Sequence, residues 1–103
     1  MDEMELICFQ IITAAGSAKS NYIGAMQKAR EGLYEEAEAM IAEGDKMLTE
    51  GHHPHADLVA KEASGENVQM GLILTHAEDQ MATAEVFKVM AEEMIELYKK
   101  INK

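Results

Sequence analysis

The sequence predicts an all-α fold in which three helices pack as an antiparallel bundle. Apolar residues make up 48% of the 103 residues but aromatic residues only 5%, and tryptophan is absent. The apolar residues are mostly alanine, methionine, leucine and isoleucine, which favour helices, and the β-branched and aromatic runs typical of strands are missing. Seven glycines and one proline interrupt the chain sparsely. The length suits a single domain that spans residues 1–103.

The charge of the chain limits its partners. Nineteen acidic and nine basic residues give a net charge of −10, which repels a phosphate backbone, so we expect no nucleic-acid partner. The acidic start of the chain does not resemble a signal peptide, and no apolar run approaches the ~20 residues that span a bilayer. We therefore expect no membrane insertion. The lone Cys8 excludes an internal disulfide and fits a reducing compartment, so we expect a cytoplasmic protein.

The first helix precedes residue 31 and is apolar on more than one side. One stripe at helical spacing is mostly alanine and comprises Ile7, Ile11, Ala14, Ala18, Ala25 and Ala29. Further apolar side chains lie off this stripe, at Leu6, Phe9, Ile12 and Ile23. A helix that is apolar on several sides needs several neighbours, and a domain this small cannot supply them all. The pattern therefore predicts that the chain assembles with further copies.

The second helix begins near Tyr34, after a break at Glu31 and Gly32. Its stripe comprises Ala37, Ile41, Gly44, Leu48, Gly51, His55, Leu58 and Val59. An interior proline costs ~3 kcal/mol and usually kinks or ends a helix, and Pro54 falls within this stretch. The residues after Pro54 keep the phase of those before it, so we predict one kinked helix.

The third helix is predicted from about Val68 to about Lys100. Gly65 suits the C-terminal cap of the preceding helix, and Asn67 suits the N-cap of this one. Its apolar stripe comprises Leu72, Ile73, Phe87, Met90, Met94 and Ile101.

Four polar residues interrupt that stripe: His76, Asp79, Gln80 and Thr83. Their spacing of i, i+3, i+4 and i+7 places all four on one side of the helix. We interpret them as a polar window in a buried face, because polar residues at core positions are unfavourable unless they are functional. The competing interpretation is that His76 is a core histidine with satisfied hydrogen bonds.

Other motifs are weaker. Neither a P-loop nor a dinucleotide-binding glycine motif is present. His52, His53 and His55 resemble a metal cluster, but a di-iron bundle needs two E-x-x-H motifs and the chain has one. We predict a solvated or partly packed histidine group that forms no functional metal site.

Residues 72–81, which read LILTHAEDQM, resemble the third-helix motif of the lactose/cellobiose-type IIA proteins of the bacterial sugar phosphotransferase system. The similarity covers nearly the whole chain. Residues 14–20, AAGSAKS, are similar to the family's A-G-x-A-R/K-S segment. Residues 29–32, 35–38, 52–53 and 61–66 also follow the family pattern in order and spacing.

The resemblance implies a homotrimer that forms a nine-helix bundle. It implies that His76 accepts a phosphoryl group from the phosphocarrier HPr and passes it to a cysteine of the IIB component. Asp79 would meet its two symmetry mates around a divalent metal ion, Mg²⁺ in our expectation, on the trimer axis. Gln80 departs from the family, which commonly has a second histidine there. Lys19 or Ser20 of the first helix, together with Gln80 and Thr83, would assist at the phosphoryl oxygens.

The resemblance leaves the sugar open among lactose, cellobiose and diacetylchitobiose. The alternative function is that of a non-catalytic three-helix adaptor, whose partner would fill the polar window. Acid-labile phosphorylation distinguishes the two.

Overall fold

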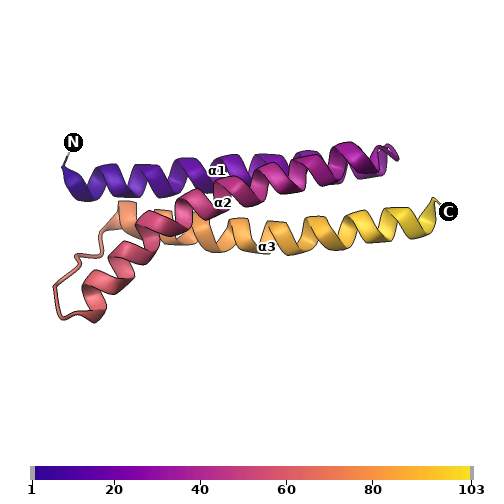
Figure 1. Ribbon diagram of the computed structural model, residues 1–103. Helices are drawn as coiled ribbons and strands as arrows, with labels where there is room; N and C mark the ends of the chain where they lie inside the picture. The colour runs from indigo at the N-terminus through magenta and orange to yellow at the C-terminus, as the bar shows by residue number, and fades with distance from the viewer. Residues whose placement is uncertain (1, 103) are drawn as a thin grey trace.

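The computed structural model describes residues 2–102, which form three helices and no strand. Helices α1 (Glu3–Arg30), α2 (Tyr34–Ala63) and α3 (Leu72–Ile101) run in alternating directions, left to right, back to the left, and left to right again in Figure 1. The molecule measures 54 × 24 × 20 Å, because each helix runs for 28 to 30 residues. The predicted all-α class and antiparallel three-helix subunit are confirmed.

Helix α1 is capped at its start and ends at a glycine. The Asp2 carboxylate accepts a hydrogen bond from the backbone N–H of Glu5 at 2.8 Å. Acidic residues occupy the first turn and basic residues the last, which suits the helix dipole. Gly32 adopts a φ of 82°, a conformation that a β-carbon disfavours, and so separates α1 from α2 where the break was predicted.

The buried face of α1 is close to the predicted one. Ile11, Ala18, Ala25 and Ala29 are buried, whereas Ile7 and Ala14 are only half-buried. Cys8, Ala15 and Tyr22 complete the buried side. Apolar side chains on the far side remain exposed in the single chain, at Leu6, Phe9 and Ile23.

Helix α2 runs unbroken through Pro54, which confirms one helix rather than two. Its first half lies along α1, and its second half diverges from α1 across the start of α3 (Figure 1). Most of the predicted stripe is buried, at Ala37, Ile41, Gly44, Leu48, Gly51 and Leu58. Val59 was wrongly included, because it is 54% exposed. His55 is half-buried.

The start of α3 differs from the prediction. Gly65 has a φ of 97° and ends α2 as expected. However, Asn67 is not the N-cap, and the helix begins at Leu72 after an extended Gly71. Val68 lies in the connecting segment, where its half-buried side chain packs against the core. That contact holds Val68 in the connecting segment, outside the helix.

A polar network joins the three helices within the bundle. The fully buried Tyr22 of α1 donates its hydroxyl to Oδ1 of Asp45 on α2 at 2.7 Å. Lys88 of α3 donates to the same oxygen at 3.0 Å and to Glu92 at 3.3 Å. Burial, followed by the Asp45 hydrogen bond, raises the pKa of Tyr22 well above its ordinary value. The Tyr22 ring therefore sits in a fixed position against α2.

Gly44 is the point at which α2 crosses that ring. A β-carbon at residue 44 would lie 2.6 Å from Cε1 of Tyr22. We expect Gly44→Ala to lower the free energy of unfolding by about 1–2 kcal/mol, because overpacking costs up to ~3 kcal/mol and outweighs the ~1 kcal/mol that alanine gains in a helix. Urea denaturation at a fixed protein concentration measures the change.

Gly24→Ala is the matched control, since residue 24 also lies inside a helix. The added β-carbon would meet the terminal methyl and the sulfur of Met40, which a flexible side chain can move away. Gly24→Ala should leave the stability unchanged or raise it. If the two variants were equally stable, the Tyr22 ring would move aside as readily as the Met40 side chain, and the prediction for Gly44→Ala would be wrong.

Candidate functional site

The four polar residues of the third helix lie on α3 as predicted, along one side over two turns. His76 and Asp79 are exposed, and Gln80 and Thr83 are half-buried. The Thr83 hydroxyl donates to the backbone carbonyl of Asp79 at 2.7 Å. The Thr83 hydroxyl proton is thus used in a hydrogen bond within α3. The imidazole of His76 is exposed, so an incoming reactant can reach it.

The interpretation of this side as a buried face is wrong for the single chain. The face of α3 that packs against α1 and α2 comprises Leu74, Ala77, Met81, Ala84, Ala91 and Ile95. Three residues of the predicted stripe are exposed instead, Leu72 at 88%, Met90 at 46% and Ile101 at 64%. The other three, Ile73, Phe87 and Met94, are half-buried. Helix α3 therefore carries two apolar stripes, and the polar residues interrupt the one that faces away from the chain's own core.

Helix α1 reaches the polar residues through Lys19. Its Nζ donates a hydrogen bond to Oε1 of Gln80 at 2.5 Å, across 61 positions of sequence. From the sequence, Lys19 and Ser20 were both predicted as residues that could assist at the phosphoryl oxygens. Of the two, Lys19 is the one that contacts a polar residue of α3. Ser20 is exposed, and within residues 2–102 no hydrogen bond connects its side chain to α3. A nucleophilic imidazole thus stands one turn from an amide that a cation holds in place.

Two of the three histidines of α2, His52 and His55, pair with glutamates of α3. His52 Nε2 lies 3.3 Å from Oε1 of Glu85, and His55 Nε2 lies 2.7 Å from Oε1 of Glu78. These contacts attach the second half of α2 to α3. In the part of the chain that the structure describes, no three histidine, cysteine or acidic residues come together as a metal site. That the histidine group forms no functional metal site stays a prediction.

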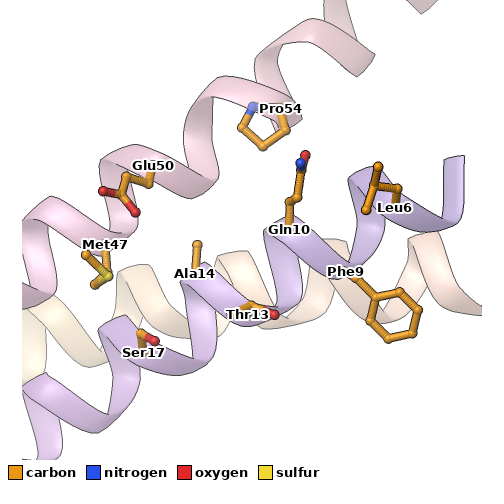
Figure 2. Close-up of a pocket in the computed structure, with 9 residues that line it drawn as sticks. All are labelled: Leu6, Phe9, Gln10, Thr13, Ala14, Ser17, Met47, Glu50 and Pro54. Atoms are coloured by element: carbon orange, nitrogen blue, oxygen red, sulfur yellow. The ribbon is translucent and has the colours of Figure 1, made fainter. Parts of the chain in front are cut away.

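A groove of about 550 Å³ lies between α1 and α2 (Figure 2). Its walls are mostly apolar, and Glu50 is the titratable residue among those that line it. No residue of α3 contributes to this groove. The groove is therefore separate from His76 and brings no nucleophile together with a base.

Comparison with known proteins tests the family resemblance. Residues 6–99 match the family model described as the lactose/cellobiose-specific IIA subunit of the phosphotransferase system. The chain belongs to this family. The lichenan-specific phosphotransferase enzyme IIA component of Bacillus subtilis is 40% identical over 98% of this chain and 92% of its own length. The lactose-specific EIIA component of Streptococcus mutans is 33% identical over 96% of this chain and 95% of its own.

Solved structures agree with the fold of this IIA subunit. The cellobiose-specific enzyme IIA from Bacillus anthracis superposes with a TM-score of 0.96 at 35% identity, over 99% of this chain and 94% of that one. The chitobiose IIA of Escherichia coli, solved in complex with HPr, gives 0.85 at 26% identity over the full length of both. Within residues 2–102, no helix combines the length and apolarity needed to cross a membrane.

Sequence reasoning identified the α3 residues of the candidate site but not their support from α1. Lys19 lies in the AAGSAKS segment that resembles the family, but the sequence did not indicate that Gln80 is its partner. The Tyr22–Asp45–Lys88 network was missed altogether. The available sign of this network was Tyr22, which lies in phase with the alanine stripe of α1.

Proposed function

We propose that this IIA subunit is a phosphoryl carrier that accepts a phosphoryl group from HPr on His76 and passes it to a cysteine of a IIB component. The transfer would serve uptake and phosphorylation of a β-linked disaccharide of the lactose, cellobiose or chitobiose class. The observation that carries the proposal is the exposed imidazole of His76, one turn before an amide held by Lys19, in a chain of this family.

The chemistry suits a histidine. A lone pair on the unprotonated nitrogen of His76 forms the new P–N bond, while the electron pair of the breaking P–N bond returns to the donor's imidazole. Each ring keeps the proton on its remote nitrogen, so charge and electrons balance. The protein's part in such a transfer is mainly to position the reactants and to supply hydrogen-bond donors to the phosphoryl oxygens.

Phosphorylation tests the proposal directly. The protein is incubated with phosphoenolpyruvate, enzyme I and HPr, and peptides are analysed under alkaline conditions that preserve phosphohistidine. We expect one phosphoryl group, on His76. HPr as the donor is supported by the Escherichia coli chitobiose IIA, which was solved in complex with HPr. This role places the subunit in the cytoplasm.

The proposed active form is a homotrimer, a nine-helix bundle. Two observations support it. Helix α3 exposes an apolar stripe that its own chain leaves uncovered, and α1 exposes Leu6, Phe9 and Ile23 on its far side. Exposed apolar surface of this extent on a small helical protein indicates contact with another surface. Three α3 helices packed around an axis would cover their stripes with one another.

Asp79 fits a metal site on that axis. Its exposed carboxylate lies on the same side of α3 as the uncovered apolar stripe, and carboxylates are preferred ligands of Mg²⁺. Three carboxylates at ~4 Å would repel one another by ~4 kcal/mol per pair at an effective dielectric of 20, so they need a cation or a shared proton. We propose a divalent ion, Mg²⁺, held by three Asp79 side chains.

Replacement of Asp79 with leucine should keep the trimer or strengthen it, because packed apolar residues often replace buried charges without loss of stability. Metal analysis of the dialysed protein should find about one ion per three chains in the wild type and none in the variant. Size exclusion with light scattering reports the assembly. An Asp79→Leu protein that does not fold, or that keeps the metal, would contradict the axial placement.

A further inference from the structure

The contact between Lys19 and Gln80 determines which way the Gln80 amide faces. A lysine ammonium has three donors and no acceptor, so only the carbonyl oxygen of the amide can receive its hydrogen bond. The structure shows this arrangement, with Nζ of Lys19 donating to Oε1 of Gln80. The amide NH₂ group of Gln80 is therefore left available as a donor on the other side.

Gln80 follows His76 by four residues, so the two side chains are neighbours on the surface of α3. A group carried on the His76 ring would lie on the same surface of α3 as the Gln80 side chain. The phosphoryl oxygens are acceptors, and they need donors rather than a second carbonyl. A Gln80 amide that rotated freely would turn its oxygen toward the phosphoryl group in part of the molecules. When that oxygen is bonded to Lys19, the NH₂ group is the part of the amide left to face the phosphoryl group.

The charge of Lys19 is also relevant to a phosphoryl group, because Lys19, unlike three other lysines, makes no ion pair with a carboxylate within residues 2–102. Lys28, Lys88 and Lys99 each lie within 4 Å of a carboxylate, and their charges are offset. The hydrogen bond that Lys19 makes is to a neutral amide. A phosphoryl group adds about two negative charges to a chain that already carries −10. A cation beside the site would offset part of that addition.

From this geometry we propose that Lys19 is a positioning residue for phosphoryl transfer at His76. It holds Gln80 so that the amide NH₂ donates to the phosphoryl oxygens, and it places a positive charge behind that amide. The inference rests on the proposed function, since it concerns the same site. It assigns to this chain a donor system assembled from two helices, in which Gln80 would touch the phosphoryl group and Lys19 would act through Gln80.

The test measures single-turnover transfer from phosphorylated HPr at several HPr concentrations, which separates the saturated rate from the half-saturating concentration. We expect Lys19→Met to lower the saturated rate about tenfold to a hundredfold and to leave the half-saturating concentration within about twofold. This loss is smaller than the ~10²–10³ that removal of one aligned donor costs, because the Gln80 amide remains and only its orientation is lost. Lys19→Arg, which is also a donor only, should stay within about threefold of the wild type. Lys19→Gln replaces Lys19→Met if the latter folds poorly.

Lys28→Met is the matched control, because Lys28 lies on the same helix and pairs with Glu36, away from Gln80. It should change neither parameter. A double-mutant cycle tests the route of the effect. In a Gln80→Leu background, Lys19→Met should cost several-fold less than in the wild type, because the amide through which it acts is already gone and only the effect of its charge remains.

Three results would overturn the inference: an unchanged rate in Lys19→Met, an effect on the half-saturating concentration alone, or the same factor in both backgrounds. The wild type is measured in parallel. If it accepts no phosphoryl group, the proposed function fails and this inference fails with it. If it is phosphorylated normally and the Lys19 variants are too, only the role of Lys19 is refuted.

Discussion

Replacement of His76 with alanine is expected to abolish phosphoryl acceptance and leave a folded helical protein. The loss should reach three orders of magnitude or more, on the order of what removal of a nucleophile costs other enzymes. His76 is exposed in the single chain, and alanine is the better helix former, so the subunit loses no core contact. Incubation with phosphoenolpyruvate, enzyme I and HPr, with peptide mapping at alkaline pH, measures acceptance. Circular dichroism reports the fold.

The other histidines provide the control. A protein with His52, His53 and His55 all changed to glutamine keeps His76 and loses the pairs with Glu85 and Glu78. We expect its acceptance to stay within about fivefold of the wild type, since no step of the transfer uses these rings. A loss as large as that of His76→Ala would contradict the prediction that these three histidines take no part in the transfer. A wild type that stays unlabelled beside a labelled relative would favour an adaptor function instead.

A single charge on the uncovered stripe of α3 is expected to dissociate the proposed trimer. Met90 is 46% exposed in the single chain and lies in phase with Phe87, Met94 and Ile101. Met90→Glu keeps helix propensity but places three carboxylates in an apolar contact. An unpaired buried charge costs about 3–5 kcal/mol, so the concentration at which the trimer dissociates should rise more than ~100-fold. Light scattering coupled to size exclusion should then report a folded monomer at micromolar concentration.

Ala39→Glu is the matched control. Ala39 is exposed on α2, on the opposite side of that helix from Ala37 and Ile41, and the substitution adds the same charge. It should leave the trimer intact. A wild type that is already monomeric at micromolar concentration would refute the nine-helix assembly. A trimer that tolerates Met90→Glu would show that another surface makes the contact.

Local signals in the sequence determined the helices. Helix formers, the Glu31–Gly32 break and Gly65 predicted the ends of α1 and α2, because the glycines adopt a φ that other residues avoid. The continuity of α2 through Pro54 followed from the phase of Leu58. The grouping of His76, Asp79, Gln80 and Thr83 on one side of α3 also followed, since helical geometry alone relates residues three and four apart.

Tertiary structure decided everything that depends on a neighbour. Helix α3 has two apolar stripes, and periodicity describes each of them equally well without saying which one faces α1 and α2. Packing selected the stripe of small residues around Ala77, Ala84 and Ala91, because alanine lets the helix backbones approach closely. The start of α3 at Leu72 depended on the burial of Val68 against the core. The bond from Lys19 to Gln80 spans 61 positions, and no local pattern in a single sequence encodes a contact at that separation.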